Sequence, residues 1–422
     1  MAEPRIVTLS ATIARQTAVI VDYCQRNNIP TPSFDLDAPP TVDIAPGEHA
    51  VLEAKDSIIA ATRELGQLMK GPAETVTDIG FVDAFTFQAI SRYNIASHVP
   101  VGSEATYDDI SKVSGLNVNS LRRVLRFVMS NGFFVEPRPN YVAHTSASRL
   151  LAENELFRAA VAMTFDENFP ASTKATEALS KTEEYTSSGW SLANNAQLHF
   201  YQELQQRHPT RHRDMVKAMD AWSSWLPVGP INKNYPWSNV KKMVDIGGGH
   251  GQVSLSIARH DPTPQFVVQD LPNVVANGPA IPTEFTNRIT FMAHDMFDEQ
   301  PVKDADVYFF RSVLHDWPDN SVVRILKALI PALKPGARVV IHDPTMPPPG
   351  TLSPRADRAK HLWDLHMMLL FNSRDREEAE WASLFEKADS RFKFLGSRLP
   401  TVDVDKIPPS GLLSIIEAEW QP

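Results

Sequence analysis

From about residue 237 onward, short apolar runs alternate with segments of helix length. The runs lie in the stretches VKKMVDIGGG, QFVVQDLP, RITFMAHDM, ADVYFFRSVLH and ARVVIHDP. Such alternation is typical of a parallel sheet whose two faces are covered by helices. The last apolar stretches, FKFLGSRLP and GLLSIIEAEW, predict two more strands, joined by a loop, that form an antiparallel pair at the sheet edge. The pattern therefore predicts an α/β domain over residues 236–422.

The N-terminal part of the chain, residues 1–150, has a mainly helical pattern. A stripe of apolar residues predicts one helix, which ends at Gly71-Pro72; it consists of Leu52, Ile58, Ile59, Leu65, Leu68 and Met69. Residues 106–147 predict two helices followed by two short strands around a Pro-Asn turn, which is a winged-helix pattern. We interpret residues 151–235 as a separate helical segment between the two domains.

The charge balance narrows the possible functions. The chain has 422 residues, with 41 Lys and Arg against 50 Asp and Glu, so its formal charge is −9. Nucleic-acid-binding domains are usually basic. We therefore expect no nucleic-acid partner and interpret the winged-helix segment as a packing or dimerisation module. Arg122, Arg123 and Arg126 would suit phosphate contacts, which keeps a DNA-binding regulator open as an alternative.

Cys24 is the single cysteine of the chain. It excludes an intramolecular disulfide and a cysteine-rich zinc site, and it fits a reducing compartment. No run of about 18 apolar residues occurs, so no membrane partner is expected. The expected location is the cytoplasm. No compact cluster of histidines and carboxylates points to a metal site.

The strongest local signal is the stretch MVDIGGGHG, where an apolar strand runs into four glycines and then into a helix. Glycines there let the backbone turn sharply and approach a ligand closely. A dinucleotide site has the spacing G-x-G-x-x-G. Here Gly247, Gly249 and Gly251 alternate, with Asp245 before them. This arrangement suits a cofactor without a pyrophosphate.

Acidic side chains follow the other predicted parallel strands; they are Asp270, Asp295, Asp316 and Asp343. The carboxyl ends of parallel strands meet at one edge, where such sheets bind ligands, so these side chains should converge. Asp270 lies about 20 residues past the glycines, where an acid can bind a pair of ribose hydroxyls. Each acid taken alone is more often a helix N-cap than a ligand-binding residue. Together they predict a nucleoside-type site, and the absence of G-x-x-x-x-G-K-[ST] disfavours a triphosphate.

His315 is the best catalytic candidate, because it lies at a strand-to-helix junction in the stretch SVLHDWPD. A histidine has an unperturbed pKa of about 6.5 and can accept a proton at neutral pH. The alternative is a histidine that is simply hydrogen-bonded at the end of a strand.

The motifs VDIGGGHG, VVQDLPNVV, HDMF, FRSVLHDWPDN, GARVVIHD and DLHMMLL…REEAEW resemble the S-adenosylmethionine-dependent O-methyltransferases of the plant caffeate type and their fungal relatives. The resemblance covers most of the chain. It implies a Rossmann-like, seven-stranded methyltransferase domain preceded by a mainly helical, winged-helix-like dimerisation domain. It also implies a homodimer, and an acceptor pocket to which residues 151–235 contribute.

The resemblance assigns roles to individual residues. His315 is expected to be the general base, oriented by Asp343 and by Asp375 or, in its place, Glu377. Asp364 and Met367 are expected beside the acceptor. The cofactor is expected to contact Asp245, Gly247, Gly248, Gly249, Asp270, Leu271, Asp295, Met296, Phe297 and Arg311.

The implied reaction is transfer of the methyl group of S-adenosylmethionine to a hydroxyl of an aromatic or polyketide-like secondary metabolite. A phenol has a pKa of about 10, so a base is needed at neutral pH. His315 would take the proton, and Asp343 would fix the imidazole tautomer. An alternative keeps the fold but uses the bound sulfonium only as an electrostatic element in a pericyclic or dehydrative step.

Overall fold

The computed structural model describes residues 3–45, 47–77, 80–182, 184–223, 228–276, 278, 280–401 and 413–422. The chain forms two compact units. Unit 1 comprises Met1–Pro170 and Glu203–Ser224, and unit 2 comprises Ala171–Gln202 and Trp225–Pro422.

Unit 1 is mainly helical, as the sequence predicts. Its elements are α1 (Arg5–Asn27), α2 (His49–Thr77), α3 (Phe81–Arg92), η1 (Ile95–His98), β1 (Glu104–Thr106), α4 (Tyr107–Ser114), α5 (Val118–Met129), β2 (Tyr141–Ala143), α6 (Ser146–Glu153), α7 (Glu155–Ala162), the π-helical η2 (Met163–Asn168) and α11 (Pro209–Ser223). Two helices, α8 (Phe169–Ala178) and α10 (Phe200–Arg207), run from one unit into the other.

The helix predicted from the apolar stripe is α2. Gly71 interrupts it with a φ of 67° and a ψ of 177°, close to the predicted end. α2 packs antiparallel on α1, as two contacts show. Arg5, at the start of α1, donates to Glu64 of α2 at 2.6 Å. Cys24, near the end of α1, packs with Val51, near the start of α2, in a small apolar core.

Residues 106–147 contain the two predicted helices, α4 and α5, but their strands differ from the predicted winged-helix pattern. β2 pairs antiparallel with β1, which precedes the helices. The other predicted strand is reduced to one bridge, between Val135 and Ala143. Pro137 and Pro139 follow directly, and a proline has no N–H to donate to a ladder.

Unit 2 contains the α/β fold that the sequence predicts for residues 236–422. Its elements are η3 (Tyr185–Ser187), α9 (Gly189–Asn194), α12 (Gly229–Asn234), η4 (Trp237–Asn239), β3 (Lys242–Ile246), α13 (Gln252–His260), β4 (Gln265–Asp270), α14 (Pro272–Ala276), η5 (Thr283–Phe285), β5 (Ile289–Ala293), β6 (Val307–Arg311), η6 (Leu314–Asp316), α15 (Asp319–Leu329), η7 (Ile330–Ala332), β7 (Arg338–Asp343), α16 (Pro354–Phe371), α17 (Glu378–Ala388), β8 (Phe392–Arg398) and β9 (Ser414–Trp420).

The segment 151–235, expected as one element of the architecture, is shared between the two units. Its helix α7 packs on α11 in unit 1, whereas its helix α9 packs on α16 in unit 2. The uniform helical pattern of this segment carries no signal for that division, because both groups of helices bury apolar faces.

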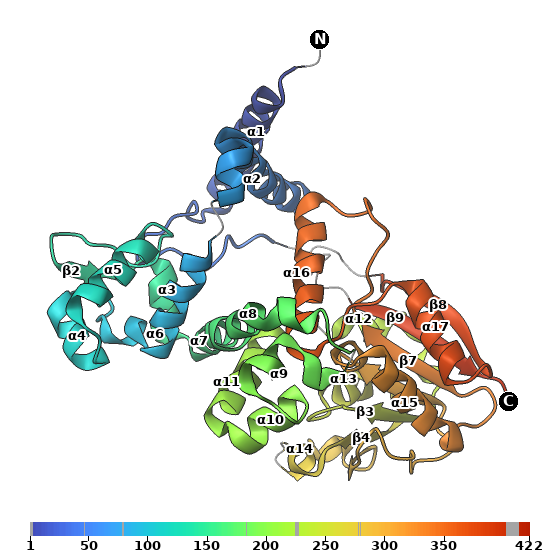
Figure 1. Ribbon diagram of the computed structural model, residues 1–422. Helices are drawn as coiled ribbons and strands as arrows, with labels where there is room; N and C mark the ends of the chain where they lie inside the picture. Colours follow the sequence, from blue (N-terminus) through green and yellow to red (C-terminus); the bar gives the residue numbers. More distant parts are fainter. Residues whose placement is uncertain are drawn as a thin grey trace. The chain divides into compact units, whose positions relative to one another are not determined.

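The seven strands of unit 2 form one sheet in the order β5-β4-β3-β6-β7-β9-β8. Strands β3 to β7 pair in parallel. β9 is antiparallel to β7 on one side and to β8 on the other. The predicted antiparallel pair is therefore present, with β9 inside the sheet and β8 at its edge (Figure 1).

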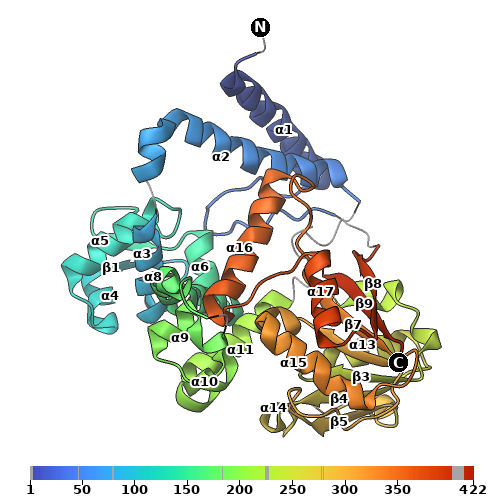
Figure 2. The ribbon, with the colours of Figure 1, turned by 45° about the vertical axis from the view of Figure 1, so that its right-hand side comes forward.

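Both faces of this sheet are apolar, because successive strand residues alternate between two cores. Val244, Tyr308 and Val339 pack with α15 and α17 on one face. Met243, Phe309 and Val340 pack with α12 and α13 on the other. Figure 2 shows α15 and α17 together on the first face. The burial of both faces fixes the register and aligns the carboxyl ends of the parallel strands at one edge. Among the described helices, none is long and apolar enough to cross a membrane.

The helix α5 offers a local test of the capping that the sequence predicts. The side chain of Asn117 accepts hydrogen bonds from the amides of Asn119, at 3.0 Å, and Ser120, at 3.3 Å. We expect Asn117→Ala to lower the free energy of opening of the first turn by about 1 kcal/mol. Hydrogen exchange of these amides measures it. Asn119→Ala, at an exposed position that caps nothing, is the control, and equal effects of the two variants would contradict the capping role.

Candidate active site

The glycine turn after β3 leaves no room for side chains on its inner side. A Cβ on Gly247 would lie 2.8 Å from a methyl carbon of Val313, and one on Gly248 would lie 2.8 Å from the carboxyl carbon of Asp245. Gly247 and Gly249 have φ of 67° and 55°, a conformation that other residues rarely adopt. A Cβ on Gly249 would meet nothing within 4 Å. The turn is thus packed from beneath and open at Gly249.

Asp270, at the end of β4, holds this turn. One carboxylate oxygen accepts the amide of Gly249 and the other accepts the amide of Leu271, both at 2.8 Å. Each oxygen keeps a further acceptor position. Burial raises the pKa of Asp270, and the two amides counteract this. The carboxylate is half-buried and can accept hydroxyl groups of a ligand at the turn.

Asp245, which is expected among the cofactor contacts, is buried under the glycine turn. Its side chain is 1% exposed and accepts the hydroxyl of Ser254 at 2.6 Å. Burial raises its pKa to about 6. Because its carboxyl group lies under Gly248, Asp245 supports the glycine turn from within the fold.

Three expected cofactor residues follow β5, which ends at Ala293. Asp295 lies two residues beyond the strand and accepts the amide of Phe297 at 3.0 Å. Asp295, Met296 and Phe297 are all partly exposed. Arg311, at the end of β6, is held in the field of Asp245 and Asp343, while burial lowers its pKa. These positions surround the carboxyl edge of the sheet, as predicted.

His315 lies in the turn η6, four residues beyond the end of β6. The carboxylate of Asp343 accepts the backbone amides of Val313 at 3.3 Å, Leu314 at 3.0 Å and His315 at 3.1 Å. The resemblance implied that Asp343 orients the imidazole itself. Instead it holds the backbone of the turn, because β7 ends level with that backbone and an aspartate side chain is short.

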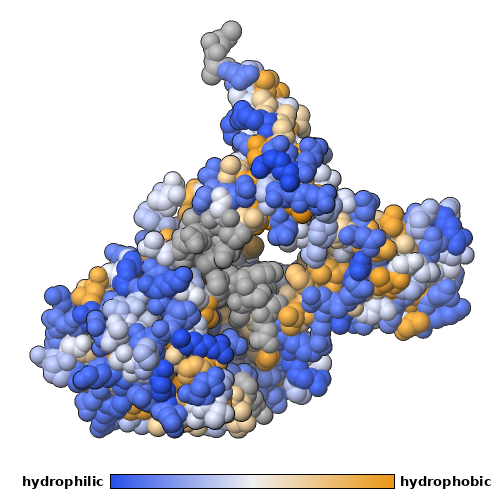
Figure 3. Space-filling model, turned by 180° about the vertical axis from the view of Figure 1, so that it is seen from behind, coloured by the Kyte–Doolittle hydropathy of each residue, from blue (hydrophilic) through white to orange (hydrophobic). Residues whose placement is uncertain are grey.

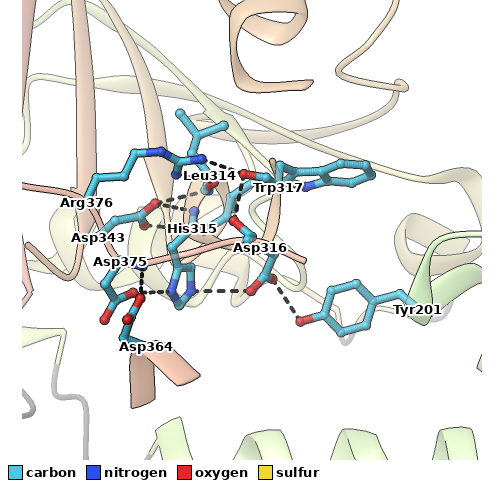
Figure 4. A network of polar contacts seen from close by, with 11 residues as sticks. Tyr201, Leu314, His315, Asp316, Trp317, Asp343, Asp364, Asp375 and Arg376 are labelled. Atoms are coloured by element: carbon cyan, nitrogen blue, oxygen red, sulfur yellow. Dashed lines mark hydrogen bonds and ion pairs between the residues drawn. The ribbon is translucent and has the colours of Figure 1, made fainter. Parts of the chain in front are cut away.

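The ring of His315 is bracketed by two other acids (Figure 4). Its Nδ1 lies 3.4 Å from Oδ1 of Asp375, and its Nε2 lies 3.6 Å from Oδ1 of Asp316. Asp375 is thus the acid at Nδ1. Glu377, the expected substitute, instead caps the N-terminus of α17. Burial alone lowers the pKa of His315, but Asp316, Asp375 and Asp343 outweigh it and raise the pKa to about 9.

Arg376 is a central residue of this turn that the sequence analysis missed. Its guanidinium is fully buried and donates to the carbonyl oxygens of Leu314, at 3.1 Å, and Trp317, at 2.6 Å. Its Nε donates to Asp319 at 2.8 Å. The turn is therefore held by an anion at its amides and by a cation at its carbonyls. In the sequence, the only sign of this role was that Arg376 directly follows Asp375.

A second missed group lies on the other side of Asp316. The hydroxyl of Tyr201 donates to Oδ2 of Asp316 at 2.9 Å. The ring of His199 stacks on Trp317, with centroids 4.0 Å apart, and lies parallel to Phe371 at 5.5 Å. Burial lowers the pKa of His199 to about 4, so its imidazole is neutral. The aromatic residues near position 200 thus pack beside the turn that carries His315.

The expected acceptor residues Asp364 and Met367 lie on α16. Asp364 accepts the amide of Asp375 at 2.9 Å, and burial raises its pKa. Met367 is 9% exposed. Asp364, Asp375 and Glu377 line a cavity of about 300 Å³. The structure therefore brings Asp364 beside the acids of the histidine turn, while Met367 is mostly packed in the interior.

The clamp formed by Arg376 makes a prediction on stability. Arg376→Met would leave Asp319 and two buried carbonyl groups without this donor, and we expect it to lower the free energy of unfolding by about 3–5 kcal/mol. Urea unfolding followed by tryptophan fluorescence measures the loss. Arg374→Met is the matched control, because Arg374 pairs with the same Asp319 from a 45% exposed position; we expect about 1 kcal/mol or less. Equal losses would show that the buried clamp contributes nothing special.

The chain is similar in sequence and fold to known O-methyltransferases. The family profile of the O-methyltransferase domain matches residues 186–391. The chain is 37% identical to the grayanic acid biosynthesis cluster O-methyltransferase of Cladonia grayi, over 99% of this chain and 88% of the relative. It is 36% identical to the chlorophenol O-methyltransferase of Trichoderma longibrachiatum, over 99% and 91%. The fold is similar to that of OxaC in complex with sinefungin and meleagrin, with a TM-score of 0.72 and 21% identity, over 97% of this chain and 99% of that one.

The similarity to the two fungal enzymes extends over nearly the whole chain, at an identity that identifies a family. The chain therefore belongs to the S-adenosylmethionine-dependent O-methyltransferases.

Proposed function

We propose that this enzyme methylates a phenolic hydroxyl of an aromatic or polyketide-like secondary metabolite, with His315 as the general base. The observation that carries the proposal is the position of the imidazole. Asp343 accepts the backbone amide of His315, and Nδ1 of the ring faces Asp375. The side chain of His315 is 15% exposed. The names of the two fungal relatives, one of which acts on chlorophenols, support a phenolic acceptor.

The residues at the carboxyl ends of the parallel strands, which we call the rim, fit S-adenosylmethionine. The open space at Gly249 admits a ligand close to the backbone, and both oxygens of Asp270 keep acceptor capacity for ribose hydroxyls. Leu271 and the partly exposed Met296 and Phe297 offer apolar surface for a base. When bound, the cofactor supplies an electrophilic methyl group on a sulfonium.

The chain's own contribution is to orient the acceptor and to remove its proton. Asp375 accepts from Nδ1 of His315, which selects the tautomer whose Nε2 has a free electron pair. Asp316 lies 3.6 Å from Nε2, too far for a good hydrogen bond, so this nitrogen can accept the proton of the acceptor hydroxyl once the imidazolium, whose pKa is raised to about 9, has given up its own. A proton arriving there forms an imidazolium between two carboxylates, which stabilise it.

An alternative keeps the fold and changes the chemistry to a pericyclic or dehydrative step. The two reactions differ in their products. Methyl transfer gives a product heavier by one methyl group together with demethylated cofactor, whereas the alternative leaves the cofactor intact. The orientation of a proton-accepting nitrogen by Asp375 favours methyl transfer, because a hydroxyl must lose its proton there.

The role of His315 as the base can be tested by mutation. We expect His315→Ala to lower turnover on a panel of phenols, chlorophenols included, by about 100- to 10,000-fold. Binding of S-adenosylhomocysteine, measured by calorimetry, should change little, because the glycine turn and Asp270 are untouched. His260→Ala, at an exposed position of α13, is the control. Full turnover in the His315 variant would refute the assignment.

We also propose that the enzyme is a homodimer that uses the exposed part of the apolar stripe on α2. Val51 and Ala54 of this helix are buried against α1, but Leu68 and Met69 remain 45% and 64% exposed. Figure 3 shows hydrophobic residues on the surface of the α1–α2 pair, at the top of the view. Exposed apolar residues grouped on one element favour association.

The dimer makes a solution prediction. We expect light scattering at micromolar concentration to give twice the mass of 47.0 kDa. The double variant Leu68→Asp and Met69→Asp should be monomeric, since two charges would be buried in the interface. Gln67→Asp on the same turn is the control and should remain a dimer. A monomeric unmodified protein would contradict the proposal.

A further inference from the structure

We infer that the hydroxyl of Tyr201 keeps His315 available as a base by sharing the negative charge of Asp316. Tyr201 is thus a positioning residue that acts through Asp316. The inference deepens the proposed function, since it concerns the same base, and it rests on a chain of three side chains in unit 2. Tyr201 donates to one carboxylate oxygen of Asp316 at 2.9 Å, and the other oxygen faces Nε2 of His315 at 3.6 Å.

The geometry leaves Asp316 few other partners. Its side chain is 9% exposed, so water gives it little solvation. Its backbone accepts a hydrogen bond from His199, and the ring of His199 is stacked on Trp317. The carboxylate is therefore held between the hydroxyl and the imidazole, as Figure 4 shows. Burial raises the pKa of Asp316 to about 6, against the opposing effects of His315 and Tyr201.

The direction of the effect follows from the charge on each side of the proton loss. Before His315 loses its proton, Asp316 faces a cation as well as the hydroxyl. Afterwards it is a buried anion that faces a neutral ring, and the hydroxyl is its main stabilising partner. A hydrogen bond to a buried anion is strongest where no other charge competes for it. Tyr201 therefore stabilises the deprotonated state most and lowers the pKa of His315.

Tyr201 can remain a donor through this transition. Burial and the neighbouring Asp316 raise the pKa of its phenol well above the ordinary value. The hydroxyl thus stays protonated when the imidazole titrates. It adds no charge of its own, so it can moderate Asp316 without neutralising it.

The other charged groups around His315 belong to different elements and keep their contacts when Tyr201 is changed. Asp343 lies under the turn and Asp375 at Nδ1. Four further groups interact with these two acids. Arg311 and Arg376 interact electrostatically with Asp343, and Lys360 interacts electrostatically with Asp375. Asp364 accepts the backbone amide of Asp375. A Tyr201 variant therefore isolates the contribution of one hydroxyl.

The test is a titration of the His315 ring in the full-length, ligand-free protein. Carbon-13 labelling of the histidine rings gives up to 13 resonances, and the one lost in His315→Gln belongs to His315. For the unmodified protein we expect a midpoint well above 6.5, near 9. In Tyr201→Phe we expect the midpoint to rise by about half a unit. Asp316→Asn should lower it, because an attracting carboxylate is removed.

Two comparisons separate this role from a structural one. Tyr201→Phe in the Asp316→Asn background should leave the midpoint unchanged, since the hydroxyl acts through that carboxylate. Tyr185→Phe is the matched control, because the ring of Tyr185 also contacts His199 and Trp317 but its hydroxyl has no bond to Asp316 among the contacts described. Replacing Tyr201 by 3-fluorotyrosine keeps the packing and strengthens the donor, so the midpoint should fall.

A midpoint that is unmoved or lower in Tyr201→Phe overturns the inference, and so does an equal shift in the Asp316→Asn background. If Tyr201→Phe does not fold, the 3-fluorotyrosine protein decides alone, and a midpoint that does not fall overturns the inference. The titration needs neither acceptor nor turnover, so it stands apart from the proposed reaction. With a phenol that is turned over, Tyr201→Phe should lose activity at pH 7 and regain it at alkaline pH.

Discussion

The carboxylate of Asp343 is the constraint on which the histidine turn depends. It accepts three successive backbone amides between the end of β6 and the start of α15, at the beginning of the short η6. Those amides would otherwise be buried without a partner, at a cost of about 1–3 kcal/mol each. Arg376 adds a charged donor to two carbonyl groups of the turn, those of Leu314 and Trp317. A buried anion and a buried cation thus replace the ladder that a strand or helix would supply, and His315 acquires one fixed position.

The position of these carboxylates depends on the register of the sheet. Asp343 ends β7 and Asp270 ends β4, and both strands are buried on their two faces. Burial on both sides fixes their register, because a slip by one residue would turn each side chain to the opposite face. The carboxylates are therefore delivered to the rim by the apolar cores, far from the polar groups that they hold.

The sequence predicted what depends on local pattern and on strand ends. The glycine turn, the acids after the strands and His315 were found in this way, because the carboxyl edge of a parallel sheet collects such residues. It did not predict which atom each acid contacts. Asp343 was expected at the imidazole and accepts the backbone amides of the turn instead. Which atom an acid reaches depends on distances no longer than one side chain, and the pattern of the sequence does not contain them.

Contacts between distant segments were beyond prediction for a different reason. Tyr201 and Asp316 are 115 positions apart. The apolar pattern around position 200 is that of an ordinary core, and a tyrosine there fits a packing role equally well. The helical segment that carries Tyr201 also gives no sign that its parts pack on two different units. Periodicity reports which face of an element is buried, and it does not report the partner.

The electrostatics of the site combine two opposing requirements. Three carboxylates around one imidazole create a negative potential at the rim, and this favours a cationic cofactor. The same potential holds a proton on His315, which a base must give up before it can act. Removing an acid would make it easier for His315 to lose its proton, but it would also weaken the attraction of a cationic cofactor. A neutral donor such as Tyr201 avoids that conflict, because it stabilises the bare anion locally and leaves the total charge of the site unchanged.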